Sequence, residues 1–466
     1  MIRAVPELVA FPYPIGYDVI NYYIPVITNL EEHWPVVSGH LPVYTLVLHS
    51  LYLATGLSPH LLVSSSGIIL YGLFSVSLFL TSSRLLRLNS IYSTYLTLFV
   101  ILQLPVLRTS WDLHKDILAL TLLLISVSLI PLRVKIGTRS IIGSCVAASI
   151  AVSVDKMVGI LFVASVVAYA FVVRVRNISF LSLIITMLFS IAVISQYGSI
   201  QQSLQYSSTN LELNQSNPTP KISNSIATLF ALFLVVNGPL LIPGVFGFIR
   251  SDNGFLKIAT TFAAVGSFSW LLFPDRQSLV ADRWIFLFGI FLSIFAGYGV
   301  LEYLRQNVSP RRRNQILFIL LGTCALLGVS YEVMPHQFTG IWRDIVGQNI
   351  EPYGPSTMQF NSISIRNTID LTSMISWINE NTPVHALFIG EKHWRGWMEL
   401  ELEDERDFMY YSSQDSALEL IEGCELDSCY LIARTSNSLG LLDEDIRIKE
   451  VYQNKLFKVY DIRNLT

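Results

Sequence analysis

Long apolar stretches alternate with short polar ones over the first 333 residues of the chain. A helix of about 20 apolar residues crosses a bilayer, and on that measure we predict about ten membrane spans, at 61–82, 91–107, 115–132, 140–154, 157–173, 178–197, 226–249, 256–273, 284–304 and 314–333. The stretch 41–56 is also apolar, but it is short and contains Pro42 and His49, so we predict a juxtamembrane helix there. The pattern is that of a polytopic α-helical membrane protein.

The pattern changes after residue 333. Helical spacing predicts helices at 370–381, with Asp370 as the candidate N-cap, and at 416–421. Short apolar runs predict buried strands at 386–389 and 430–433, and 447–452 and 456–460 are predicted to form a terminal hairpin. These elements predict a small α/β domain. We therefore divide the chain into an external loop with juxtamembrane helices (1–60), a transmembrane helical domain (61–333) and an extracytoplasmic α/β domain (334–466).

Composition agrees with a membrane protein, because 52% of the residues are hydrophobic and only 14% are charged. A net charge of -3 favours no class of partner, and no Lys/Arg run with interleaved aromatic residues indicates nucleic-acid binding. The first residues lack the basic, apolar and small-residue segments of a secretory signal. We expect insertion to rely on a later span, or on one that precedes this sequence.

Basic residues gather in alternate loops, which predicts the topology because cytoplasmic loops are enriched in Lys and Arg. One set of loops contains Arg84, Arg87, Arg133, Lys135, Arg139, Arg174, Arg176, Arg250, Lys257, Arg305, Arg311, Arg312 and Arg313. The opposite set contains fewer, namely Arg3, Arg108, Lys115, Lys156, Lys221, Arg276 and Arg283. The first set is therefore predicted to be cytoplasmic, and the N-terminal loop and the C-terminal domain extracytoplasmic.

The four cysteines divide into two kinds. Cys145 and Cys324 lie within apolar spans, where buried thiols pack. Cys424 and Cys429 flank a short polar stretch in the C-terminal domain, and they form a disulfide if that domain lies in an oxidising compartment and stay free if it does not. A metal site there is not expected, since no second pair of ligands is nearby.

Two polar loops on the external side carry the motifs that point to a function. The N-terminal loop reads Pro-Tyr-Pro-Ile-Gly-Tyr-Asp-Val-Ile-Asn-Tyr-Tyr-Ile-Pro over 12–25, and it resembles the first external loop of the GT-C superfamily of membrane glycosyltransferases. The resemblance continues at 110–116 (Ser-Trp-Asp-Leu-His-Lys-Asp), at 282–284 (Asp-Arg-Trp) before an apolar stretch with Gly-Tyr-Gly at 297–299, and at 377–383. Within that superfamily the chain resembles the protein-mannosyltransferases and aminoarabinose transferases of archaea or bacteria. It lacks the Trp-Trp-Asp-Tyr-Gly signature of oligosaccharyltransferases.

The resemblance implies an enzyme that uses a polyprenyl- or dolichyl-phosphate sugar, with Asp18 as the base that activates the acceptor. Such a transfer passes through an oxocarbenium-like state, so an acceptor hydroxyl needs a base and the departing phosphate needs positive charge. The alternative for Asp18 is a turn or cap residue after Gly16. Tyr17 and Tyr22, beside it in the loop, are predicted to bind substrate.

Asp112 and Asp116 lie one helical turn apart in the second loop, so both could face the same polar vestibule. We expect them to orient the acceptor or to hold a divalent cation such as Mg or Mn through oxygen ligands. The alternative for Asp116 is a pair with Lys115 or a cap on the next span. His114 between them is predicted to form hydrogen bonds at the interface and to contact substrate.

Arg283 lies at the external mouth of a predicted span, where a guanidinium can bind a phosphate through two parallel hydrogen bonds. It is our predicted ligand of the lipid phosphate, and the alternative is a local salt bridge to Asp282 or Asp275. Further candidates for that role are Lys156, Lys115 and Arg276.

Together these features predict an inverting glycosyltransferase that moves a sugar from the lipid carrier to an extracytoplasmic glycan, lipid or protein. A transporter or flippase for lipid-linked saccharides is the main rival, but it predicts charges deep within spans, and the spans here are nearly free of charge. A non-catalytic assembly subunit of the same fold is the third hypothesis. The Trp-rich stretch 393–397 is predicted to pack within the C-terminal domain.

Overall fold

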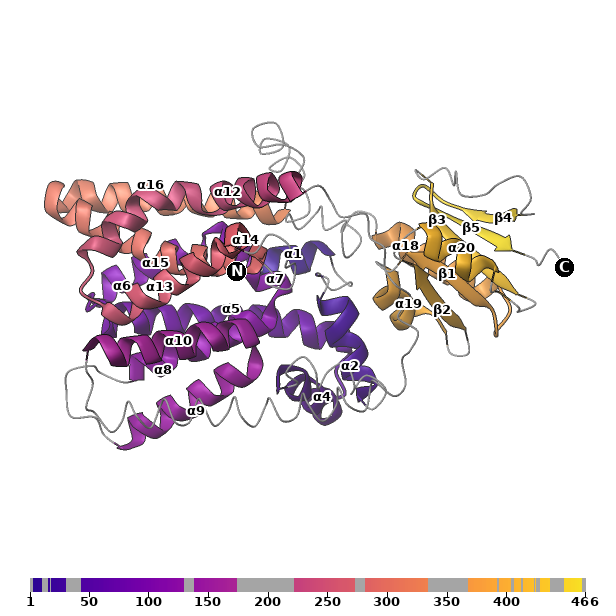
Figure 1. Ribbon diagram of the computed structural model, residues 1–466, viewed down its shortest axis with the longest axis horizontal. Helices are drawn as coiled ribbons and strands as arrows, with labels where there is room; N and C mark the ends of the chain where they lie inside the picture. The colour runs from indigo at the N-terminus through magenta and orange to yellow at the C-terminus, as the bar shows by residue number, and fades with distance from the viewer. Residues whose placement is uncertain are drawn as a thin grey trace.

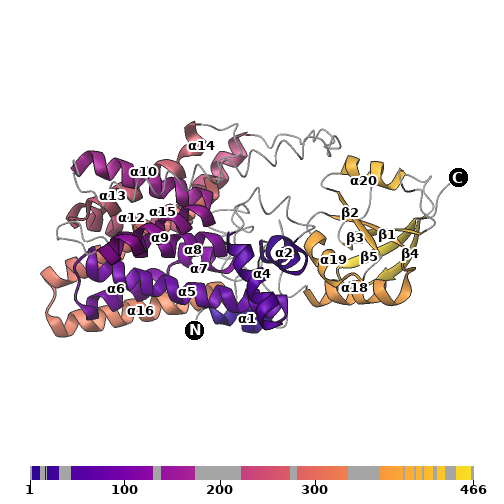
Figure 2. The same cartoon turned by 90° about the horizontal axis from the view of Figure 1, so that it is seen from below.

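The structure is a computed structural model, and it describes residues 3–10, 16, 18–30, 43–129, 138–173, 222–272, 281–333, 368–391, 394–403, 406–411, 414–422, 424, 428–435 and 448–462. A bundle of helices occupies one side of the molecule, and a sheet with flanking helices forms the C-terminal part on the other (Figure 1). Seen from below, the short helices α2 and α4 lie between the two parts (Figure 2).

The bundle is preceded by short elements that cover one of its ends: α1 (Ala4–Ala10), the π-helix η1 (Val19–Tyr23), α2 (Ile24–Thr28) and α4 (Val43–Thr55). The predicted juxtamembrane helix corresponds to α4. The bundle itself consists of α5 (Pro59–Arg84), α6 (Ser90–Ile101), α7 (Leu104–Asp112), α8 (His114–Leu129), α9 (Thr138–Val154), α10 (Lys156–Val173), α12 (Ile222–Arg250), α13 (Gly254–Ser267), α14 (Ser269–Leu272), α15 (Ala281–Asn307) and α16 (Pro310–Val333).

The described residues do not confirm the predicted count of about ten spans. Within them, four helices are long and apolar enough to cross a membrane, and the bent pair α6 and α7 would make a fifth. The predicted span 91–107 is interrupted because Pro105, which lacks a backbone N–H, starts a new helix at an angle of 66°. The predicted span 178–197 lies outside the described residues. The chain is thus a multi-pass membrane protein.

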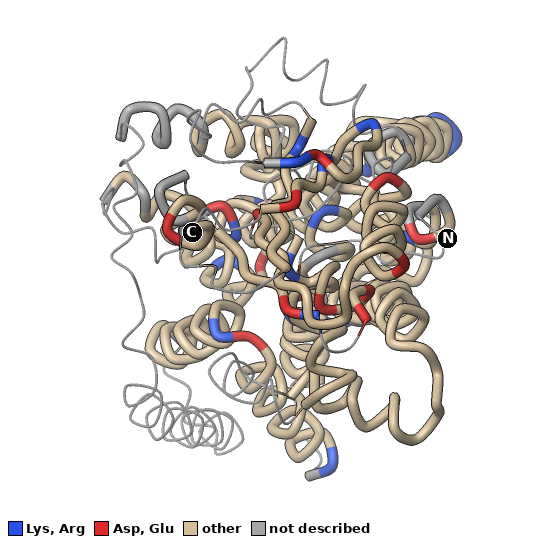
Figure 3. The backbone as a smooth tube through the Cα atoms, turned by 90° about the vertical axis from the view of Figure 1, so that its right-hand side faces the viewer, with Lys and Arg blue, Asp and Glu red and all other residues tan. Residues whose placement is uncertain are grey.

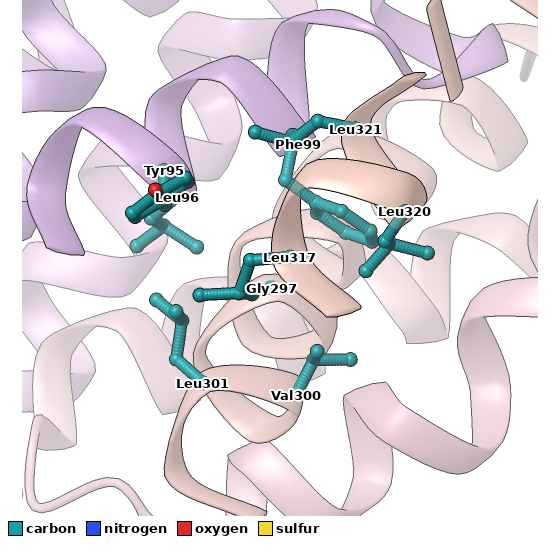
Figure 4. Close-up of a pocket in the computed structure, with 9 residues that line it drawn as sticks. All are labelled: Tyr95, Leu96, Phe99, Gly297, Val300, Leu301, Leu317, Leu320 and Leu321. Atoms are coloured by element: carbon teal, nitrogen blue, oxygen red, sulfur yellow. The ribbon is translucent and has the colours of Figure 1, made fainter. Parts of the chain in front are cut away.

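Helix α15 is the centre of the bundle. In its most apolar window 83% of the residues are buried, against 11% in α16, whose apolar side chains face outward. It packs closely on α12, because Gly247 and Gly299 bring the two backbones together where a Cβ would overlap main-chain atoms. A small apolar pocket lies between α6, α15 and α16 and is lined by residues such as Phe99, Gly297 and Leu320 (Figure 4). No charged side chain lines it, so the pocket lacks the groups that proton transfer or phosphate binding would need.

The C-terminal part contains a five-stranded mixed sheet with strand order β2-β1-β3-β5-β4. Its elements are α18 (Thr368–Asn381), β1 (Leu387–Glu391), α19 (Arg395–Glu401), β2 (Asp407–Tyr411), α20 (Gln414–Glu422), β3 (Cys429–Arg434), β4 (Ile448–Gln453) and β5 (Phe457–Ile462). The strand β1 runs parallel to β2 and β3, whereas β5 is antiparallel to β3 and β4.

The predicted helices, buried strands and terminal hairpin of this part are confirmed, and α19 and β2 are additional. Asp370 lies inside the first turn of α18 rather than at its cap. Cys424 and Cys429 form a disulfide. Trp394 and Trp397 are buried, as the packing interpretation predicted.

Candidate active site

Asp18 directly precedes η1, which brings its carboxylate to the end of the bundle that carries the C-terminal domain. The chain turns at Gly16, where a φ of 110° favours a residue without a side chain. Asp18 then occupies the N-cap position of η1, but its side chain makes no capping hydrogen bond. Only 7% of Asp18 is exposed, and a carboxylate Oδ2 lies 3.7 Å from a guanidinium nitrogen of Arg283. The carboxylate is therefore directed at a charge partner and not at its own helix.

Arg283 is in the first turn of α15, so the central helix of the bundle begins at this site. The ion pair of its guanidinium is with Asp18, which is far away in sequence, and not with the neighbouring Asp282. The Arg283 side chain is 32% exposed and that of Asp18 is 10% exposed. A separation of 3.7 Å is a loose pair, and a partly exposed guanidinium can still turn toward a second anion.

Two further carboxylates, Asp116 and Asp155, adjoin this ion pair. Asp116 lies in the first turn of α8 and Asp155 between α9 and α10, and their side chains are within hydrogen-bonding reach of each other. The Asp155 Oδ1 also accepts a hydrogen bond of 2.8 Å from the backbone N–H of Val158, which caps α10. Arg283 and Lys115 are close enough to act electrostatically on Asp116. Adjacent carboxyl groups repel each other unless a proton or a cation is held between them.

Sequence analysis did not identify Asp155 as a site residue. The available signal was its place in a very short turn before Lys156, on the same predicted face as the other candidates. Lys156 itself begins α10 and is exposed.

Asp112 and Asp116 do not share one helix, which corrects the expectation that they lie one turn apart on it. Helix α7 ends at Asp112, Leu113 has φ −98° and ψ 58°, and α8 begins at His114. The Asp112 side chain is outside the part of the chain that the structure describes, as are Tyr17 and Arg276. Their predicted roles stay predictions.

His114 is buried beneath η1. Its ring stacks on that of Tyr23 with centroids 5.6 Å apart, and its Nδ1 lies 3.0 Å from the hydroxyl of Tyr44. The side chain of Arg3 completes this layer, where its Nε donates to the carbonyl of Ser110. His114 therefore supports η1 from below, and its predicted contact with substrate stays a prediction. Tyr22, on the other side of η1, is 37% exposed.

The site is built from segments far apart in sequence that meet at one end of the bundle. The first turns of α8 and α15 and the turn before α10 converge on the start of η1. Figure 3 views the molecule from the side of the C-terminal part and marks the Lys and Arg positions and the Asp and Glu positions along the backbone. No cluster of three or more His, Cys, Asp or Glu side chains suited to a metal occurs among the described residues. What the site offers is a carboxylate facing a cation, next to a pair of carboxyl groups.

Comparison with known proteins identifies the fold. No family model and no curated protein matches the sequence. The chain is similar to the structure of ArnT from Cupriavidus metallidurans in the apo state, with a TM-score of 0.57, 12% identity and coverage of 99% of this chain and 97% of that one. ArnT bound to undecaprenyl phosphate gives a TM-score of 0.50, with the same identity and coverage.

The arabinofuranosyltransferase AftD from Mycobacteria gives a TM-score of 0.52 at 11% identity, over 99% of this chain and 39% of AftD. The chain therefore has the fold of the GT-C glycosyltransferases, as its loop motifs predicted.

Proposed function

We propose that this protein is an inverting glycosyltransferase that moves a sugar from a polyprenyl- or dolichyl-phosphate carrier to an extracytoplasmic acceptor. The observation that carries the proposal is the pair of Asp18 and Arg283, which sets a carboxylate opposite a cation at the mouth of the bundle. The structural similarity to ArnT bound to undecaprenyl phosphate supports a lipid-linked donor.

In this proposal each member of the pair has one task. Arg283 turns from Asp18 to the phosphate of the donor, and its positive charge stabilises the anion that leaves. Asp18, released from the pair, accepts the proton of the acceptor hydroxyl. The acceptor oxygen forms a bond to the anomeric carbon as the bond from that carbon to the phosphate oxygen breaks, and the phosphate keeps the electron pair. A single displacement of this kind inverts the anomeric centre.

Asp116 and Asp155 are the residues suited to hold a divalent cation, if one takes part. Both offer hard oxygen ligands, and one oxygen of Asp116, Oδ1, has no hydrogen-bond partner although it is buried. Mg²⁺ in proteins is commonly held by one or two carboxylates and by phosphate oxygens of the substrate. A cation there would supply positive charge to the leaving phosphate, and a proton shared by the two carboxyls is the alternative.

The extracytoplasmic placement of the site rests on two observations. The basic loops lie in the set opposite to the loops that contain Asp18, Asp116 and Arg283. In addition, the disulfide between Cys424 and Cys429 suits an oxidising compartment, and the C-terminal part that contains it lies at the same end of the bundle as the site.

The test uses the full chain, purified into lipid nanodiscs. Undecaprenyl-phosphate-linked hexoses and pentoses serve as donors, a glycolipid extract serves as acceptor, and mass spectrometry follows the transferred sugar. The Asp18→Asn variant should fold normally but lose activity by about a hundredfold or more, because a positioned base typically contributes 10²–10⁴. Unchanged turnover in Asp18→Asn would remove Asp18 from the mechanism. Chelation with EDTA in the same assay distinguishes a cation between Asp116 and Asp155 from a shared proton.

A further inference from the structure

One helix of the C-terminal part lies directly against the segment that carries Asp18. The backbone N–H of Gly396, in the first turn of α19, donates a hydrogen bond of 3.0 Å to the Oδ1 of Asn21. Asn21 is the middle residue of η1, and 375 positions separate the two residues in sequence. A side chain of the π-helix thus fixes the backbone of a helix from the other end of the chain.

The two backbones are in such close contact that only glycine fits at position 396. A Cβ added to Gly396 would lie 2.7 Å from the carbonyl oxygen of Ile20 and 2.8 Å from the Oδ1 of Asn21. Real Cβ atoms do not approach a backbone oxygen so closely, so any larger residue would push η1 and α19 apart.

Buried apolar side chains of both helices lie beside this part-buried hydrogen bond. Ile20 and Tyr23 of η1 belong to one buried cluster with Trp394, Trp397 and Met398 at α19, all of them 2% exposed or less. On the opposite side of η1, the ring of His114 stacks on Tyr23. The segment is therefore held between the bundle and α19.

We propose that α19 is a positioning element of the active site, in which Gly396 and Asn21 clamp η1 so that Asp18 faces Arg283. The inference rests on the proposed function, because it gives the clamp the task of directing the catalytic carboxylate. Asp18 immediately precedes the clamped helix, so a shift of η1 displaces its carboxylate by a similar distance. Misplacement of a reacting group by about 1 Å can reduce the rate a hundredfold.

Four variants of the full chain test the clamp in the nanodisc assay described above. Asn21→Leu removes the hydrogen-bond acceptor at nearly constant size, whereas Asn21→Asp keeps a side-chain oxygen that can accept from Gly396. Gly396→Ala forces the backbones apart. Gly322→Ala is the matched control, because Gly322 lies in α16 with open space around it and a Cβ there meets nothing within 4 Å.

We expect kcat to fall by about ten- to a hundredfold in Asn21→Leu and Gly396→Ala, with the KM for the lipid-linked donor within about twofold of wild type. Asn21→Asp should retain most of the activity, and Gly322→Ala all of it. Hydrogen exchange should also become faster at the amides of residues 19–23 in the two damaging variants, at a temperature where all variants are folded. A purely structural contact would lower thermal stability without this separation of kcat from KM.

Wild-type kcat in both Asn21→Leu and Gly396→Ala would overturn the clamp, as would equal losses in Asn21→Leu and Asn21→Asp. Failure of the proposed function is a different result, because it appears as wild-type turnover in Asp18→Asn whatever the clamp variants do.

Discussion

Replacement of Arg283 separates its contribution to stability from its contribution to the reaction. Two charges 3.7 Å apart attract with about 4.5 kcal/mol in a medium of effective dielectric constant about 20. Because nearly a third of the Arg283 side chain is exposed, solvent screening and side-chain entropy reduce the net share in folding to about 1 kcal/mol. We therefore expect Arg283→Ala to lower the free energy of unfolding only slightly.

The effect on the reaction should be much larger. If Arg283 stabilises the charge on the departing phosphate, its loss should resemble the loss of one oxyanion donor, which costs about 10²–10³ in kcat. Donor affinity should fall as well, since the same guanidinium binds the phosphate in the ground state. Arg283→Lys keeps the charge but loses the paired geometry, and we expect an intermediate defect.

The assay measures undecaprenyl phosphate binding and turnover for Arg283→Ala, Arg283→Lys and Asp282→Ala at temperatures matched to the stability of each variant. Asp282→Ala is the control, since Asp282 is adjacent to Arg283 in α15, whereas the ion-pair partner of Arg283 is Asp18. A defect of Asp282→Ala as large as that of Arg283→Ala would indicate a local structural pair. Unchanged binding and turnover in both Arg283 variants would refute the phosphate role.

Two further predictions concern topology and pH. In a background without Cys145 and Cys324, a membrane-impermeant thiol reagent should label Val384→Cys in intact cells, because Val384 is 47% exposed in the C-terminal part; labelling only after permeabilisation would invert the topology. Burial raises the pKa of Glu401 above its ordinary value of 4.5, so the folded state retains the Glu401 proton more readily than the unfolded state. The contribution of Glu401 to stability therefore falls as the pH rises above 4.5. Glu401→Gln should accordingly melt at a higher temperature than wild type at pH 7 and lose that advantage near pH 4, as measured by thermal unfolding; a variant less stable at pH 7 would contradict the reasoning.

The helices of the bundle were predictable where apolar length alone decides the structure. The runs that became α5, α12, α15 and α16 were found because the bilayer requires continuous apolar helices. The break between α6 and α7 was missed, although Pro105 marks it, because an apolar run does not show whether a proline starts a new helix or only bends one. In the C-terminal part, β2 escaped prediction because its side chains are mostly exposed and so lack an apolar pattern.

The site was predictable to the extent that loop motifs and the placement of charge reveal it. Asp18 was identified through the resemblance of its loop to that of the GT-C superfamily, and Arg283 as a basic residue at the mouth of a predicted span on the side with few basic residues. The structure brings the two together. Asp116 and Asp155 come together only because α8 packs beside α9 and α10. The residues around each aspartate do not reveal that packing, so the pair could not be predicted from the sequence. The contact of Gly396 with Asn21 was hidden for the same reason, since it joins opposite ends of the chain.

The π-helical winding of η1 determines the direction in which the Asp18 carboxylate points. A π-helical turn is equivalent to one residue inserted into an α-helix, and here it is marked by the hydrogen bond from the backbone N–H of Ile24 to the carbonyl of Val19. Deleting one residue from 19–23 would allow the segment to wind as an α-helix continuous with α2, which would rotate everything before it by about 100°. Asp18 would then point away from Arg283 although both residues were still present. The direction of the Asp18 carboxylate thus depends on the number of residues between Gly16 and α2. A related protein with one residue fewer there would need a catalytic base at another position.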